Sequence, residues 1–107
     1  MRILLDECVT KKLKVHMHVH EVVTVNDLGW NGLRNGALIQ AAIREGIELL
    51  LTIDKNILHQ QRIDRLPIIV VVFDATSSKV EDLVPFVPAF LEKLPEFTRG
   101  QVHVLSL

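Results

Sequence analysis

The sequence is poor in the residues that build disulfide frameworks, cysteine-rich metal sites and base-stacking surfaces. Its 107 residues include one cysteine, Cys8, one tryptophan and no tyrosine. A single cysteine excludes an internal disulfide and a zinc site made of cysteines alone. With so few aromatic residues, the chain has little material for stacking bases, which is common in proteins that bind single-stranded nucleic acids.

An excess of one charge and a long apolar run are also missing. The 12 Lys and Arg against 13 Asp and Glu give a net charge of −1, so any RNA or DNA site must be a local patch. The longest apolar run, 66–73, has the length of a strand, and Asp6 interrupts the apolar start before it reaches signal-peptide length. We therefore expect a cytoplasmic protein without a membrane segment.

Short apolar runs are what the chain does have. Hydrophobic residues make up 49% of the sequence, which excludes intrinsic disorder, and the length suits a single domain over 1–107. Apolar, often β-branched runs without polar alternation predict strands that are buried on both faces. The expected strands lie near 2–5, 20–25, 48–53, 67–73 and 101–106. The last one alternates, as a half-exposed edge strand does.

Helical patterns separate these strands. Asn35 is predicted to cap a helix that ends at Gly46, and Asp54 to cap a short helix that reaches about Arg62. The regular alternation predicts an α/β fold, a three-layer sandwich with a mainly parallel five-stranded sheet and right-handed crossovers. The pattern does not give the strand order.

The last helix carries its own start and break signals. Ser78 and Glu81 form a predicted capping box at its beginning. Pro85 and Pro88 lie inside the apolar helical pattern, so we expect a kink or two segments there.

Acidic residues follow each of the first four predicted strands. They are Asp6 with Glu7, Asp27, Asp54 and Asp74. Open α/β sheets bind ligands beyond the carboxyl ends of their strands. If the first, third and fourth strands are neighbours, three carboxylates share one site and repel one another unless Mg²⁺ or Mn²⁺ neutralises them. Asp is also common in loops and at helix caps, so each acid has a local explanation as well.

Four segments in this order resemble a family of small bacterial PIN-like proteins: residues 3–7 (ILLDE), 20–25 (HEVVTV), 28–33 (LGWNGL) and 50–56 (LLTIDKN). The resemblance implies a three-layer α/β nuclease that holds Mg²⁺ or Mn²⁺ with three or four acids and cuts RNA. Many PIN domains are the toxins of toxin–antitoxin pairs and are held inactive by a small partner protein. By fold analogy, the resemblance implies a similar role here.

Two residues match the family's acids directly. Asp6 matches the acid that ends the first strand, and Asp54 matches the acid of the Thr-x-Asp motif after the third. The resemblance makes both of them catalytic residues and metal ligands. Glu7 and Asp74 are expected to help hold the metal.

The chain also departs from the family pattern. Asn35, Gly36 and Ala37 open a helix that often begins with acids in this family, and Asn56 stands where a further Asp is common. The amide oxygens of Asn35 and Asn56 are candidate metal ligands, but they add no charge. The resemblance therefore implies weak metal binding, and it leaves a non-catalytic PIN-like protein-binding module as the alternative.

Three further expectations concern RNA binding, an alternative fold function and the oligomeric state. Lys11, Lys12 and Lys14 form a local basic patch that suits an RNA backbone, although a solvated helix face is the explanation that we favour. We reject a phosphoacceptor receiver domain, because its usual layout needs a lysine after the fifth strand and residues 101–107 contain none. We expect a homodimer, or a complex with a small antitoxin-like protein.

Overall fold

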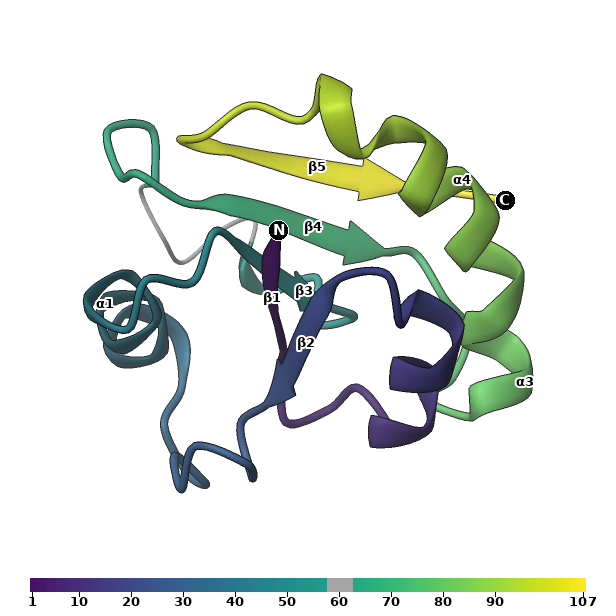
Figure 1. Cartoon of the computed structure of the whole chain (residues 1–107), viewed down its shortest axis with the longest axis horizontal. Helices are drawn as coiled ribbons and strands as arrows, with labels where there is room; N and C mark the ends of the chain where they lie inside the picture. Colours follow the sequence, from purple (N-terminus) through teal and green to yellow (C-terminus); the bar gives the residue numbers. More distant parts are fainter. Residues whose placement is uncertain (58–62) are drawn as a thin grey trace.

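The computed structural model describes residues 1–57 and 63–107, without the side chain of Asn35. Five strands form one sheet in which every neighbouring pair is parallel, in the order β2-β1-β3-β4-β5 (Figure 1). The strands are β1 (Arg2–Leu5), β2 (Glu21–Thr24), β3 (Leu49–Thr52), β4 (Ile69–Phe73) and β5 (Gln101–Leu105). All five fall within the predicted ranges, and β5 is an edge strand as predicted.

The central strands are buried on both faces, whereas the edge strands are not. Every residue of β3 and β4 is buried, and so are the last three residues of β1. The two edge strands, β2 and β5, each carry exposed residues. This difference explains why unbroken apolar runs marked β3 and β4, while an alternating run marked β5. The run at 22–25 also lacks alternation, but β2 lies at an edge of the sheet, so the expectation that it is buried on both faces is wrong.

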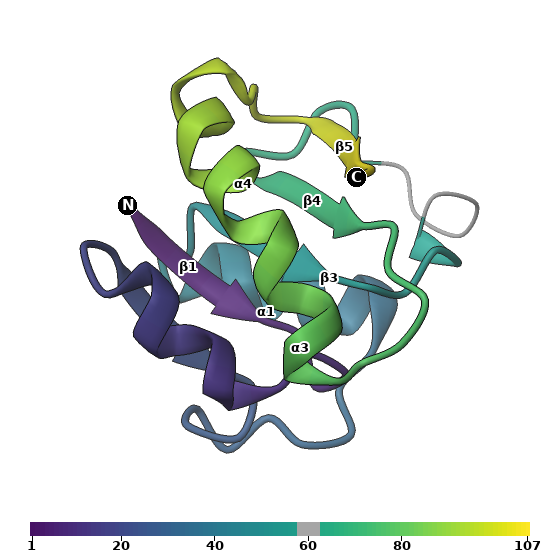
Figure 2. The ribbon, with the colours of Figure 1, turned by 90° about the vertical axis from the view of Figure 1, so that its right-hand side faces the viewer.

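Helices cover both faces of the sheet, and Figure 2 shows α3 and α4 in front of it and α1 behind it. The α4 face carries η1 (Lys11–Met17), α3 (Val80–Leu83), η2 (Val84–Phe86), α4 (Val87–Lys93) and η3 (Leu94–Glu96), and the α1 face carries α1 (Asn35–Arg44). On the α4 face, Phe73 stacks on Phe86 at 4.9 Å between ring centres and meets Phe90 edge-on at 5.6 Å. The predicted three-layer α/β sandwich is confirmed.

Prolines divide the last helical stretch into short segments, as the sequence predicts. Pro85 and Pro88 each lie in the first turn of a segment, η2 and α4 respectively. At such a position, the N–H that proline lacks has no partner within the helix in any case. Within the described residues, no helix has the length and apolar character that crossing a membrane requires.

The capping box that we predicted at Ser78 and Glu81 is wrong. Lys79 occupies the N-cap position of α3 and makes no side-chain cap. Ser77 supplies the local hydrogen bonds instead, because its Oγ accepts the Lys79 N–H at 3.1 Å and donates to the Asp82 carboxylate. Adjacent serines offer the same chemistry, so the sequence pattern selected the wrong one.

The cap predicted for α1 is also wrong, by one position. Arg34 is the N-cap residue and makes no side-chain hydrogen bond there, so Asn35 is the first residue of the helix. Asp54 does accept the Asn56 N–H at 2.9 Å, as a residue that starts a helical turn does. The rest of that predicted helix, to Arg62, lies outside the described residues.

One crossover has the opposite hand to the other three. The β1–β2 connection moves toward one edge of the sheet over the α4 face. The β2–β3 connection moves toward the other edge over the α1 face, and the described ends of the β3–β4 connection pack on that face through Ile57 and Ile63. The β4–β5 connection moves in that same direction but over the α4 face, where it buries Phe73. The prediction of right-handed crossovers therefore cannot hold for all four.

The turn into β5 generates a stability prediction. Gly100 has a φ of +77°, and a Cβ there would lie 2.8 Å from the Asp64 carbonyl oxygen; Gly29 has a φ of +71° with nothing within 4 Å. We expect Gly29→Ala to lower the free energy of unfolding by about 1–2 kcal/mol, the cost of left-handed backbone. Gly100→Ala should cost more, since backbone must move. Equal losses in urea denaturation would contradict the close approach.

Candidate functional site

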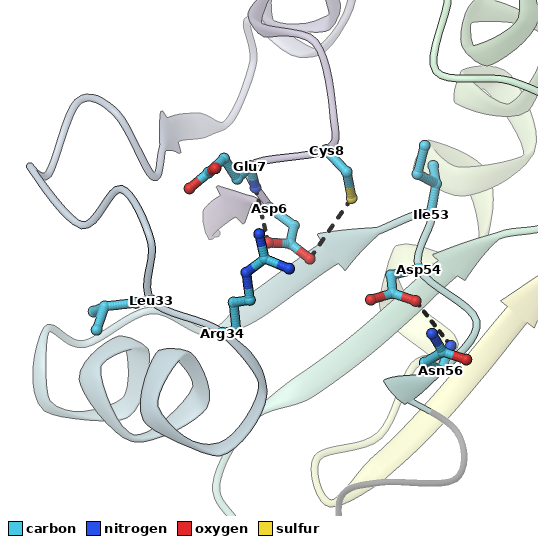
Figure 3. Close-up of a pocket in the computed structure, with 8 residues that line it drawn as sticks. All are labelled: Asp6, Glu7, Cys8, Leu33, Arg34, Ile53, Asp54 and Asn56. Atoms are coloured by element: carbon cyan, nitrogen blue, oxygen red, sulfur yellow. Dashed lines mark hydrogen bonds between the residues drawn. The ribbon is translucent and has the colours of Figure 1, made fainter.

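Two carboxylates follow neighbouring strands and line one cavity. Asp6 follows β1 and Asp54 lies just beyond β3, and these strands pair in parallel with Leu5 opposite Leu51. The cavity has a volume of about 420 Å³, and Figure 3 shows the residues that line it: Asp6, Glu7, Cys8, Leu33, Arg34, Ile53, Asp54 and Asn56. In the order β2-β1-β3, successive crossovers reverse direction between β1 and β3, which is where open α/β sheets bind ligands.

A buried hydroxyl joins these two acids. Thr52, the last residue of β3, is fully buried, donates its hydroxyl to Asp6 Oδ2 at 2.8 Å and accepts the Asp54 N–H at 3.0 Å. The Glu7 N–H donates to Asp6 Oδ1 at 2.8 Å, so both oxygens of Asp6 are oriented. In the sequence, Thr52 drew attention only as part of the Thr-x-Asp motif. A hydroxyl at the end of an otherwise apolar strand is the signal that points to it.

The two outer acids at the carboxyl end of the sheet are each paired with a lysine. Asp27, after β2, lies 2.6 Å from Lys14 Nζ, and Asp74, after β4, lies 2.5 Å from Lys55 Nζ. The hydrogen bond from Lys14, with a further one from the backbone of β2, lowers the pKa of Asp27 to about 2. The hydrogen bond from Lys55 lowers the pKa of Asp74. Asp74 is not among the described residues that line the cavity.

The other predicted ligands contribute unequally. Glu7 lines the cavity, but its Oε1 accepts the Gly32 N–H at 2.9 Å, and Figure 3 shows its carboxylate turned away from the Asp6 carboxylate. Asn56 lines the cavity beside Asp54. The side chain of Asn35 lies outside what the structure describes.

Arg34 is a cavity residue that the sequence did not single out. Figure 3 shows its side chain rising from the start of α1 toward Asp6. Of the predicted basic patch, Lys14 is engaged by Asp27, whereas Lys11 and Lys12 are exposed at the start of η1. The family pattern in this segment concerns the acids that are missing after Arg34, so it gives no indication that the positive charge of Arg34 matters.

Cys8 lies beside both acids without being an activated thiol. Its Sγ is 3.6 Å from Thr52 Oγ1 and 3.7 Å from Asp6 Oδ2. Desolvation raises the pKa of the Cys8 thiol, and the negative charges of Asp6 and Asp54 add to the rise. Reactive cysteines need the opposite surroundings, positive charge that stabilises the thiolate. Nucleophilic catalysis by Cys8 is therefore not what this arrangement favours.

The donors at the cavity fit a weakly held Mg²⁺ or Mn²⁺. Asp6 and Asp54 supply two carboxylates, and Asn56 supplies an amide oxygen. In the part of the chain that the structure describes, no three His, Cys, Asp or Glu side chains form a metal-binding group. Mg²⁺ is nevertheless often held by one or two carboxylates when waters and substrate phosphates complete its ligands. The donor set therefore suits a cation that the substrate helps to hold.

Comparisons of the chain with protein-family models, with curated proteins and with solved structures found no match. The resemblance to PIN-like proteins rests on the sequence segments alone.

The hydrogen bonds of Thr52 generate the second prediction. Thr52→Val keeps the branched shape but leaves the Asp54 N–H and one oxygen of Asp6 without this partner. We expect the free energy of unfolding, measured in urea, to fall by about 1–3 kcal/mol. Thr98→Val, at an exposed threonine, should stay within about 0.5 kcal/mol of the parent. A Thr52→Val protein as stable as the parent would contradict the bridge between the acids.

The third prediction concerns Asp27. Lys14→Met should raise the Asp27 pKa from about 2 toward 3.8, whereas Lys12→Met, which changes an exposed lysine of the same helix, should leave it unchanged. A depressed folded pKa means that the carboxylate stabilises the fold above pH 3.8, and that this contribution disappears as the pH falls toward 2. Carboxyl ¹³C NMR titration measures both variants. An Asp27 pKa that both substitutions leave the same would show that Lys14 is not its partner in solution.

Proposed function

We propose that this chain is a metal-dependent ribonuclease of the PIN-like type, with Asp6 and Asp54 as its metal-binding carboxylates. The observation that supports it most is their convergence in one cavity between β1 and β3, joined by the Thr52 hydroxyl. Neither carboxylate has an ion-pair partner among the described residues, and two carboxylates that line one cavity are an arrangement that can bind a divalent cation. The family resemblance supplies the substrate class, RNA.

The residues of the cavity would have different roles in this reaction. Bound Mg²⁺ or Mn²⁺ lowers the pKa of a water and neutralises charge on a phosphate. Asp6 holds a fixed orientation, because Thr52 and Cys8 both donate to its Oδ2 and the Glu7 N–H donates to its Oδ1, which leaves a lone pair of Oδ1 free. Asp54 is held less tightly, by the Asn56 N–H. None of the described residues that line the cavity is His or Lys, so a proton leaving the water has only a carboxylate to accept it.

A non-catalytic PIN-like binding module is the second candidate. It is favoured by the engagement of Glu7 with Gly32 and of Asp74 with Lys55, which leaves Asp6 and Asp54 as the uncommitted carboxylates among the described acids at the cavity. The partner would be a small antitoxin-like protein or a second copy of the chain, in the cytoplasm. Light scattering of the purified chain distinguishes a homodimer from a monomer whose partner is a different protein.

The fourth prediction tests the nuclease. The unmodified protein should cleave single-stranded RNA in the presence of Mn²⁺, and Asp6→Asn should lower the rate by about 100-fold or more while the protein stays folded, with a melting temperature lowered only by the loss of one of the hydrogen bonds that Asp6 accepts from Thr52 and Glu7. The matched control is Asp74→Asn, the same substitution after the next strand, where the carboxylate is paired with Lys55. Its rate should change little. Gel assays of a labelled oligoribonucleotide give the rates, and circular dichroism gives the melting temperatures.

Two outcomes would redirect this proposal. Cleavage that survives both Asp6→Asn and EDTA would come from another mechanism or another enzyme. If the unmodified protein cleaves nothing with any metal, the binding module becomes the function. Asn56→Asp together with Asn35→Asp then tests whether a third and a fourth carboxylate restore activity.

A further inference from the structure

The cavity has walls of opposite charge. Asp6 and Asp54 come from the ends of β1 and β3, and Arg34 reaches into the same space from the start of α1 (Figure 3). Of the described residues that line the cavity, Arg34 alone is positively charged. Its guanidinium forms no ion pair with any described residue and does not cap the helix. Arg34 is an exposed cation that lines the same cavity as two carboxylates and makes no ion pair with either of them.

Two lysines near the carboxyl end of the sheet are occupied differently. Lys14 and Lys55 each pair with an acid that follows a strand, Asp27 and Asp74. These lysines neutralise the outer acids and do not line the cavity. Arg34 thus differs from them both in its position and in its lack of a described partner.

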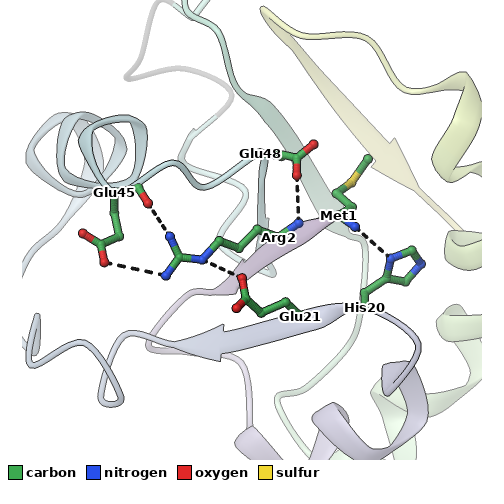
Figure 4. Close-up of polar contacts among 6 residues, drawn as sticks. All are labelled: Met1, Arg2, His20, Glu21, Glu45 and Glu48. Carbon is green, nitrogen blue, oxygen red and sulfur yellow. Dashed lines mark hydrogen bonds and ion pairs between the residues drawn. The ribbon is translucent and has the colours of Figure 1, made fainter.

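Arg2 shows what a structural arginine looks like in this chain. At the opposite end of the sheet, its Nε lies 2.7 Å from Glu21, and its guanidinium also contacts the carboxylate and the carbonyl oxygen of Glu45 (Figure 4). Its backbone N–H donates to Glu48. Arg2 joins β1, β2 and the end of α1, and its contacts explain its charge. The contacts of Arg34 do not.

We propose that Arg34 binds a phosphate group of single-stranded RNA in this cavity. The inference rests on the proposed function and names the residue that recognises its substrate. A guanidinium binds two phosphate oxygens in parallel hydrogen bonds, which fixes the orientation as well as the charge of the group. Two carboxylates repel a phosphate, so a cation that lines the same cavity offsets the repulsion. The volume of about 420 Å³ is within the usual range of ligand pockets.

The chain offers a matched control on the same helix. Arg44 is exposed in the last turn of α1, at the end of the helix remote from Arg34. Arg34→Ala and Arg44→Ala remove the same charge from the same helix, but only Arg34→Ala removes it from the cavity. Arg34→Lys keeps the charge and loses the paired donors.

The test measures binding by fluorescence anisotropy of a labelled single-stranded oligoribonucleotide, titrated at several KCl concentrations in EDTA and again with CaCl₂. Arg34→Ala should weaken binding by about tenfold or more in both conditions, because a hydrogen bond to a charged group is lost. It should also reduce the slope of log affinity against log salt by about 0.7, the contribution of one phosphate contact on a single strand. Arg34→Lys should retain the slope with part of the affinity, and Arg44→Ala should retain both.

Two RNA ends identify the phosphate. Oligoribonucleotides with a 5′-phosphate and with a 5′-hydroxyl should bind equally if Arg34 holds an internal phosphodiester, and the 5′-phosphate should bind more tightly if it holds the end of the strand. Either result keeps the phosphate site.

Equal affinities and equal salt slopes for Arg34→Ala, Arg44→Ala and the parent would overturn the phosphate site. If Arg34 controls binding in EDTA but Mn²⁺ produces no cleavage, the phosphate site stands and the nuclease fails. If cleavage depends on Asp6 but Arg34→Ala leaves RNA binding unchanged, the nuclease stands and the phosphate site fails.

Discussion

β3 is buried on both faces, and both the core and the cavity are built around this strand. Leu49 and Leu51 belong to the core of the α4 face, and Leu50 belongs to that of the α1 face. Each such leucine contributes about 1.5–3 kcal/mol by leaving water. Thr52 ends the strand with a hydroxyl that would cost free energy if it were unpaired. The hydroxyl donates to the Asp6 carboxylate and accepts the backbone N–H of Asp54, so the contacts that satisfy this buried group also orient the Asp6 carboxylate.

The acids at the carboxyl end of the sheet fall into two classes. The outer ones, Asp27 and Asp74, have lysine partners that lower their pKa values, and they behave as ordinary parts of the fold. The inner ones, Asp6 and Asp54, are joined through a neutral hydroxyl, which leaves their negative charges in place. Neither inner acid has an ion-pair partner among the described residues, and our proposed function depends on this difference from the outer acids.

Much of the fold was predictable because burial leaves its mark on the sequence, and contacts between strands do not. The runs LLL and IVVVF identify β3 and β4, because only a strand covered on both faces tolerates them. Nothing in those runs says that β1 pairs with β3, and hence that Asp6 meets Asp54. The sequence does not give the hand of the β4–β5 crossover either. That hand depends on which face of the sheet the connection covers, and here it covers the face that carries Phe73. Arg34 escaped notice because its place in the cavity depends on where α1 begins in space.

Charge in the cavity also couples the two ligands that we propose for it. Two carboxylates without a third hold a divalent cation weakly, and without the cation they repel a phosphate. Each ligand therefore removes an obstacle to the other, and such coupling is reciprocal. Arg34 lowers the cost of the first phosphate contact, so RNA can enter before the cation and then complete its ligands. The sparse acids of the cavity and an arginine without an ion pair among the described residues are consistent parts of the arrangement that we propose, in which the metal would be held together with the substrate.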